Sequence, residues 1–474
     1  MLDDFVLKVK ELTNEISDGT TSLVSESRRV LNRAFDKQIC IGITGFSGSG
    51  KSTFITSLIH QLRYSNEAQI NGFLLARDQK IIDIKLSSLP DCDLFDYDQG
   101  INALAGEPPK WPMPTSTISG CVVDIIYKRD SLLNSILGDT STFRIEIRDY
   151  PGEWLLDLPL LEQDYWSWCQ DNIEFNNQSN RKQIMGDLLQ QLQSVNPFDV
   201  LTEHQINMLF DSYTKFLKQC KQEGLTFIQP ARFLLPDPSQ SAIPFFPLLG
   251  LHQYDVDSLN NADEACIYKV MKRRYQRYIS NIVQPFFDGL FNKVDRQIVL
   301  IDVLKALSDG KENFEDMLIS LTRIMNVYKY GFNRVFNKIS SPRVERIIFL
   351  ASKPDQVLFN QHENLRSLVN DIILYVCPQS VRNAIPIDTE VVCSVRCTKE
   401  DNKHLVGVLL NDIQHRLSHP QIPETIPKSE DWELFETWHM QQLLPPRIPG
   451  LKQGARLASI RMGTVLKDMI GDKF

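Results

Sequence analysis

The chain has 474 residues, of which 42% are hydrophobic and 23% are charged, and its formal net charge is −8. This length and composition are those of a globular protein with two or three domains and a sizeable core, and they exclude an intrinsically disordered chain. The negative charge argues against broad nonspecific binding to nucleic acid. We therefore expect no nucleic-acid partner.

Nine cysteines are scattered along the chain and none of them forms a C-x-x-C pair. This distribution favours free thiols in a reducing compartment over a disulfide framework or a zinc site. The N-terminus lacks the basic and apolar regions of a signal peptide, and no stretch approaches the ~18 apolar residues of a membrane span. We expect a cytoplasmic protein, for which a peripheral membrane-protein partner stays open.

The first elements surround a glycine-rich motif. Residues 1–38 predict a helical segment that leads into a strand at residues 38–44, and residues 51–62 carry apolar side chains at helical spacing. Between strand and helix, residues 45–52 read GFSGSGKS and fit the phosphate-binding pattern G-x-x-x-x-G-K-[ST]. Glycine allows successive backbone N–H groups to turn toward one anion at the start of a helix.

The motif therefore predicts a phosphate site. Lys51 would reach the β- and γ-phosphates, and the Ser52 hydroxyl would ligate Mg²⁺. The residues predicted to bind phosphate are Phe46, Ser47, Gly48, Ser49, Gly50, Lys51, Ser52 and Thr53. The motif identifies a phosphate ligand but does not identify the base, because ATPases and small kinases carry it as well.

The next segments predict a sheet that a large insertion divides. Residues 83–117 are dense in Pro, Gly and Asp and predict a loop, and residues 121–129 and 142–149 predict two strands. Because apolar and polar residues alternate over 141–149, we expect a half-solvated antiparallel pair at the sheet edge. Residues 156–295 carry long helical patterns with few β-branched runs.

Strand patterns resume at 296–303, 346–352 and 390–396, and helical stretches separate them. Alternating strands and helices predict an α/β fold, with a mostly parallel sheet covered by helices on both faces. The expected organisation is an N-terminal helical segment (1–38), the first half of a nucleotide-binding domain (39–155), an all-helical insertion (156–295), the second half (296–420) and a C-terminal extension packing on the core (421–474).

Polar residues follow the predicted strands, where ligands bind in open parallel sheets. Asp149 ends one strand and is placed to hold Mg²⁺, directly or through water. Three residues later, Gly152 can offer its N–H group to the γ-phosphate. This order predicts a second magnesium and phosphate element beside the first.

Residues 352–355, Ser-Lys-Pro-Asp, match the guanine-reading pattern [NT]-K-x-D except in the first position. The Asp355 carboxylate can accept two hydrogen bonds from the N1–H and N2–H₂ edge of guanine, whereas adenine presents an acceptor at N1. Residues 394–396 are similar to the S-A-K element, whose backbone N–H meets guanine O6. The residues predicted to bind guanine are Ser352, Lys353, Asp355, Ser394, Val395 and Arg396.

Two other nucleotide-binding classes fit less well. A transport ATPase is excluded because L-S-G-G-Q is absent, and because Asp149 precedes Tyr-Pro-Gly rather than a catalytic Glu. A small-molecule kinase would need an Arg-rich lid, for which residues 271–279 are the candidate. Those residues also fit the solvated face of an amphipathic helix.

At residues 148–161, RDYPGEWLLDLPLL, the sequence resembles the YcjX family of GTP-binding bacterial stress proteins, which are P-loop GTPases of the Ras-like class. Residues 227–236 and 296–307 agree with the resemblance. It implies a Ras-like domain split by a helical insertion, GTP or GDP bound with Mg²⁺, and a role in stress response. The effector or activating protein stays unknown.

The resemblance also implies roles for individual residues. Magnesium would be held by Ser52, Thr115 and Asp149, with Thr115 as the first-switch threonine and Thr117 as the fallback. The residues implied in catalysis are Lys51, Thr115, Gly152 and Glu153.

Glu153 departs from the Ras and Gα pattern, which has Gln at this position. A carboxylate near the anionic γ-phosphate favours slow hydrolysis by Coulomb repulsion. Ahead of Thr115 the switch loop has Lys110 as its cation and no arginine. Further charge would come from Arg232 in the insertion or from a partner.

The sequence thus predicts a Mg²⁺-dependent GTP-binding switch with slow GTPase activity. Two alternatives stay open, namely a P-loop small-molecule kinase and a scaffold that GTP stabilises without switching.

Overall fold

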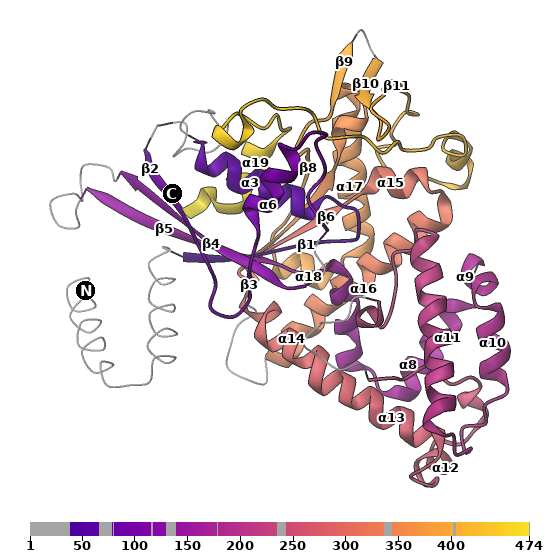
Figure 1. The fold of residues 1–474 in the computed structure, drawn as a ribbon. Helices are drawn as coiled ribbons and strands as arrows, with labels where there is room; N and C mark the ends of the chain where they lie inside the picture. Colours follow the sequence, from indigo (N-terminus) through magenta and orange to yellow (C-terminus); the bar gives the residue numbers. More distant parts are fainter. Residues whose placement is uncertain are drawn as a thin grey trace, which may run out of the picture.

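The computed structural model describes residues 38–65, 78, 80–114, 117–128, 139–177, 179–234, 243–335, 344–401 and 404–473. Residues 1–37 of the predicted N-terminal helical segment lie outside the described residues, as does Thr115. Figure 1 shows one central sheet with helices on both faces and a group of helices to one side.

Among the described residues, eight strands form the central mixed sheet in the order β2-β4-β5-β1-β6-β7-β8, with β3 beside β4. In this order the strands β5, β1, β6, β7 and β8 are parallel, whereas β4 is antiparallel to both β2 and β5 and parallel to the short β3. This sheet confirms the predicted α/β fold. The strands are β1 (Gln38–Gly45), β2 (Ile81–Ser87), β3 (Asp93–Leu94), β4 (Ser119–Lys128), β5 (Thr140–Asp149), β6 (Arg296–Ile301), β7 (Arg346–Ser352) and β8 (Ile387–Val392).

Two expectations for the first half of the sheet were wrong. Residues 83–117 are not all loop, because they include most of β2 and the helix α6 (Tyr97–Leu104), which the Asp96 side chain caps. The β4–β5 pair is antiparallel as predicted, but β2 takes the edge position. Glu146 and Arg148 of β5 are buried rather than solvated, and they contact Gln38 and Asp91 respectively.

Alternate residues of the strands enter two separate cores, as the two-residue period of a strand requires. Ile348 and Leu350 of β7 join the core beneath α3 (Lys51–Arg63), α6 and α19 (Met462–Ile470). Ile347 and Phe349 face the opposite core, beneath α16 (Lys311–Val335) and α17 (His362–Val376). The C-terminal helix α19 is therefore part of the core.

Between β5 and β6 the described residues form helices joined by irregular segments, and they include no strand. In Figure 1 this part of the chain lies on the opposite side of the molecule from the projecting ends of β2 and β5. Its aromatic centre surrounds Trp168 and belongs to the same hydrophobic core as α16 and α17. The elements are the 3₁₀-helix η2 (Gly152–Glu162), α8 (Tyr165–Asn176), α9 (Ser179–Ile184), α10 (Gly186–Gln193), α11 (Glu203–Gln222), η3 (Ala231–Phe233), η4 (Leu251–Gln253), α12 (Val256–Asn260), α13 (Ile267–Tyr278), the π-helix η5 (Ile279–Val283), α14 (Gln284–Gly289) and η6 (Phe291–Lys293).

After β8 the chain forms a small antiparallel sheet of β9 (Thr398–Asp401), β10 (His404–Val408) and β11 (Gln414–Leu417). The C-terminal extension returns to this sheet, where Leu443 forms a bridge with Leu409. Within the described ranges, no helix combines the length and the apolar character that crossing a bilayer requires.

Candidate functional site

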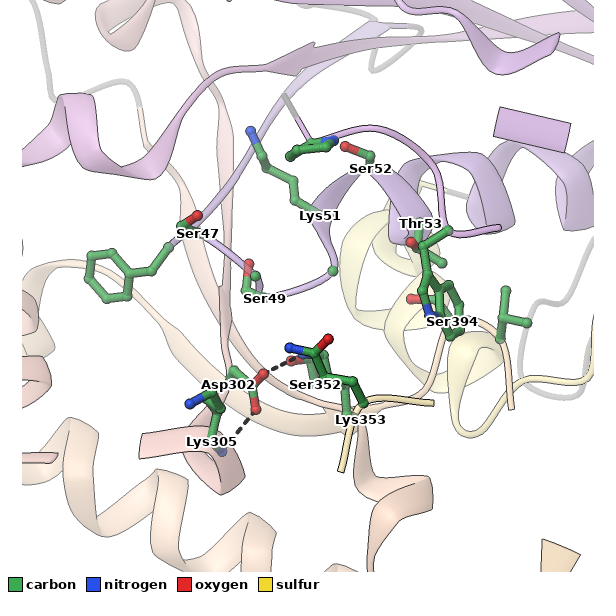
Figure 2. A pocket seen from close by; sticks show the side chains of 18 of the residues that line it. Ser47, Ser49, Lys51, Ser52, Thr53, Asp302, Lys305, Ser352, Lys353 and Ser394 are labelled. Carbon is green, nitrogen blue, oxygen red and sulfur yellow. Dashed lines mark hydrogen bonds and ion pairs between the residues drawn. The ribbon is translucent and has the colours of Figure 1, made fainter. Parts of the chain in front are cut away.

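A pocket of about 730 Å³ opens beyond the carboxyl ends of β1, β7 and β8. This is the position at which open α/β sheets bind ligands, and the volume is in the range of small-molecule sites. Figure 2 shows the loop from Ser47 to Ser52 across the pocket from Asp302 and Lys353. One wall therefore comes from the phosphate-loop motif and the facing wall from the predicted guanine motif.

The glycine-rich loop has the backbone of an anion site. Gly48 and Gly50 have φ angles of 80° and 84°, which a residue with a Cβ atom adopts only with strain. Helix α3 begins directly afterwards at Lys51, and the predicted residues 46–53 all line the pocket. The loop thus presents a helix N-terminus to the pocket, where backbone N–H groups favour negative charge.

Lys51 and Asp149 form an ion pair of 2.7 Å just behind this loop, and both side chains are buried, with 8% and 1% of their surface exposed. The Lys51 ammonium also donates a hydrogen bond of 2.7 Å to the Tyr150 carbonyl oxygen. Ser119 Oγ lies 3.4 Å from the other Asp149 oxygen. Asp149 lies beside the Ser119 hydroxyl, and Ser52 lines the pocket at the start of α3. Carboxylate and hydroxyl oxygens are the hard donors that Mg²⁺ prefers, so the residues present fit this ion.

Gly152 packs directly against the start of the phosphate loop. A Cβ atom at this position would lie 2.5 Å from the Gly45 carbonyl oxygen and 2.6 Å from the carbonyl carbon. Both are backbone atoms, so no side chain can move to make room. A glycine is therefore required at position 152 for a steric reason, in addition to the predicted role of its N–H group as a donor to phosphate.

Glu153 lines the pocket and pairs with Lys221, whose Nζ atom lies 3.3 Å from Glu153 Oε1. Lys221 is in the last turn of α11 and also lines the pocket. Arg232, the cation expected there from the sequence, instead stacks its guanidinium 3.3 Å from the centre of the Trp154 ring and is absent from the pocket wall. Sequence reasoning missed Lys221.

At the guanine end, Asp355 Oδ2 accepts a hydrogen bond of 2.9 Å from the Cys397 N–H group. Lys353 has a φ of 59°, and its ammonium donates to Asp302 Oδ2 at 2.5 Å. Ser352 Oγ lies 3.4 Å from the Ile301 carbonyl oxygen of the neighbouring strand. Hydrogen bonds to residues distant in the sequence therefore hold all three predicted side chains of this motif at the pocket.

The predicted guanine-binding element at 394–396 follows the end of β8, and only part of it lies at the pocket. Ser394 and Val395 line the pocket, and the Ser394 carbonyl oxygen accepts a hydrogen bond from Ser57 of α3. Arg396 is exposed and is not part of the wall. Its backbone N–H donates to the Ala458 carbonyl oxygen, and its Nε–H donates to the Thr398 carbonyl oxygen. Cys397 takes the adjacent wall position.

Two further predicted segments lie away from the pocket wall. Thr117, the fallback switch threonine, is half-buried and does not line the pocket. Residues 271–279 also contribute nothing to the wall. In that helix Met271, Tyr275 and Tyr278 are buried and Arg274 pairs with Glu203, as expected for an amphipathic helix rather than a kinase lid.

Comparison with known proteins shows the family of the chain. A family model described as "YcjX-like family, DUF463" matches residues 39–474. The chain belongs to the YcjX-like family. A protein of Shewanella oneidensis named "Ras-like GTPase YcjX" is 30% identical over 474 residues, covering 95% of this chain and 98% of the relative. A protein of Escherichia coli K12 with the same name is 31% identical over 465 residues, covering 95% and 99%. The chain is thus a GTPase-like protein.

The C-terminal extension supplies a wall that the sequence did not predict. Met440, Gln441, Gln442 and Leu443 line the pocket. Trp111, on the loop of the predicted first switch, donates from its indole N–H to the Leu443 carbonyl oxygen at 2.6 Å. The extension is therefore tied to that loop beside the pocket.

Asp157, on η2 beside the site, should make the free energy of unfolding depend on pH. Burial raises its pKa to about 6, although Tyr278, the Ala231 N–H group and the Arg232 charge favour the carboxylate. Because the native state then binds a proton more tightly than the unfolded chain, its contribution to stability falls as pH rises from about 4 to about 6.

We expect the free energy of unfolding of the wild type, relative to Asp157→Asn, to fall by roughly 2 kcal/mol between pH 4.5 and pH 7.5. Urea denaturation of both proteins at the two pH values measures this difference. A difference that does not change with pH would contradict the raised pKa.

Proposed function

We propose that the chain is a Mg²⁺-dependent GTP-binding protein that hydrolyses GTP slowly. The observation that carries the proposal is one pocket lined by both the phosphate loop of residues 46–53 and the carboxylate of Asp355. The first feature suits a chain of phosphates, and the second suits the donor edge of guanine. Because both line one pocket of about 730 Å³, a single nucleotide can contact both.

The residues have distinct roles in this proposal. The N–H groups of the loop bind the phosphate oxygens, and Lys51 exchanges the Tyr150 carbonyl oxygen for a phosphate oxygen. Ser52 and Asp149 would hold Mg²⁺, which supplies positive charge to the β- and γ-phosphates when bound. Gly152 offers its N–H group to the γ-phosphate, and Asp355 receives the guanine edge. Thr115 is kept as the proposed third magnesium ligand.

The proposal also covers regulation. Trp111 and Pro114 on one side and Glu153 on the other line the pocket, so γ-phosphate would order residues 110–120 and 149–158 and hydrolysis would release them. We propose that this switch acts in a bacterial stress response in the cytoplasm, through an effector that is not known. The proposed domain boundaries remain 39–155 and 296–420 for the GTPase domain, with 156–295 as the insertion.

The test is calorimetric titration of the purified protein with GDP and with ADP in Mg²⁺. We expect tight binding of GDP, weak binding of ADP, and an affinity for GDP that is about 100-fold lower or worse in Asp355→Asn. The reason is that an amide cannot accept both guanine hydrogen bonds, each worth ~1.5–3 kcal/mol to a charged acceptor.

Asp401→Asn is the matched control, because Asp401 is an exposed carboxylate on the nearby strand β9. It should bind GDP like the wild type. Equal or tighter binding of ADP by the wild type would contradict the guanine site. It would favour the alternative that the chain is an ATP-dependent kinase.

A further inference from the structure

We propose that Lys221 is a positioning residue for GTP hydrolysis, which pairs with Glu153 so that this carboxylate can hold the attacking water beside the γ-phosphate. The proposal rests on the proposed function. It assigns a part in the reaction to the helical insertion, since Lys221 belongs to α11.

The geometry places Lys221 at the phosphate end of the pocket. With Glu153 it lines both the main pocket and an adjoining cavity of about 290 Å³, which also contains Phe46 and Ser47 of the phosphate loop. Glu153 follows Gly152, whose Cα packs against the backbone of Gly45. Glu153 is therefore fixed next to the loop, and the 3.3 Å contact with Lys221 sets the direction of its side chain.

The other cations near this end have their own partners. Lys305 lines both cavities but pairs with Asp309, Lys51 pairs with Asp149, and Arg232 stacks on Trp154. Of the described residues, Lys221 is the cation that pairs with Glu153. Its side chain is 31% exposed, whereas that of Glu153 is 11% exposed. Replacing Lys221 should therefore disturb packing little while it removes the counter-charge of a more buried carboxylate.

The pair answers the electrostatic objection to a glutamate at this position. An unpaired carboxylate would repel the γ-phosphate, whereas a carboxylate paired with an ammonium group adds no net charge. In hydrolysis the water oxygen bonds to the γ-phosphorus while the bond from that phosphorus to the β–γ bridging oxygen breaks. The electron pair of that bond leaves with GDP. One water proton stays on the attacking oxygen and the other passes to another oxygen of the same phosphate, so that dihydrogen phosphate is released. Glu153 accepts a hydrogen bond from the water and orients it.

Single-turnover hydrolysis of GTP in Mg²⁺, together with calorimetric GDP affinity and melting temperature, tests the proposal. We expect Lys221→Met to lower the hydrolysis rate about 10- to 100-fold. This is less than the roughly 10²- to 10⁴-fold that a general acid or base contributes, because Lys221 acts through Glu153. GDP affinity should stay unchanged, because GDP lacks the γ-phosphate. The melting temperature should fall only slightly, because Lys221 is 31% exposed and the pair is partly open to solvent. Lys221→Arg should retain most of the rate.

Lys218→Met is the matched control, because Lys218 is exposed on the same helix and away from the pocket. It should hydrolyse GTP at the wild-type rate. Lys221→Gln repeats the measurement with a polar side chain, so the result does not depend on one variant's folding.

The Glu153→Gln background separates positioning through Glu153 from a direct effect on phosphate. If Lys221 acts through Glu153, adding Lys221→Met to Glu153→Gln should slow hydrolysis no further. A full Lys221→Met defect in that background, or a wild-type rate in Lys221→Met alone, would overturn the inference while leaving the GTPase proposal standing. A wild-type protein that binds no GTP would overturn both.

Discussion

Replacing Gly152 with alanine is expected to weaken nucleotide binding at least about tenfold and to lower the free energy of unfolding by about 1–3 kcal/mol. The added Cβ atom would lie 2.5 Å from the Gly45 carbonyl oxygen. Because Gly45 begins the phosphate loop, relief of this clash must move the loop or η2. Titration with GDP and denaturant unfolding measure the two effects.

Gly186→Ala is the matched control, because a Cβ atom at Gly186 in α10 would meet nothing within 4 Å. Alanine in a helix should leave stability equal to the wild type or higher by up to about 1 kcal/mol, and GDP affinity should not change. Wild-type binding and stability in Gly152→Ala would contradict this prediction, because they would mean that the backbone at Gly45 can move away at little cost in free energy.

The parts of the site that the sequence predicted depend on local chemistry. Gly48 and Gly50 have positive φ angles that glycine adopts readily, and Lys51 starts the helix that the apolar spacing predicts. Asp149 and Asp355 lie at or just after strand ends, and parallel strands bring such ends to one edge of the sheet. Motif, strand and helix together were enough to place these residues.

The parts that could not be predicted depend on tertiary packing. Lys215, Lys218 and Lys221 all lie on α11, and only the docking of this helix decides which one reaches the pocket. The contact from Trp111 to Leu443 spans 332 residues of sequence. Arg232 carried the right charge, but the aromatic face of Trp154 holds its guanidinium.

The segment after Gly152 links the nucleotide to the insertion. Trp154, Leu155 and Leu156 of η2 are buried in the core that the insertion shares with the sheet. If binding of a γ-phosphate moves Gly152, the buried residues of η2 that follow it must move too, and the packing of the insertion helices changes with them. The proposed second switch thus differs from an exposed loop, because its release would have to change a packed core that has few alternative arrangements.

Lys51→Met is expected to destabilise the nucleotide-free protein by about 3–5 kcal/mol in addition to abolishing nucleotide binding. The reason is that Asp149 is 1% exposed and would lose the ammonium group 2.7 Å away. A buried charge without its counter-ion is costly, whereas the loss of both charges costs much less. Denaturant unfolding without nucleotide measures the difference.

Lys51→Met/Asp149→Asn should therefore be more stable than Lys51→Met, although neither binds nucleotide. Lys311→Met is the surface control, because Lys311 and Glu315 form an exposed pair of 3.8 Å, and it should change stability by less than about 1 kcal/mol. A double variant less stable than Lys51→Met would mean that Asp149 is held mainly by contacts other than Lys51. In that case the ion pair would contribute little to the conformation of the phosphate loop in the nucleotide-free protein.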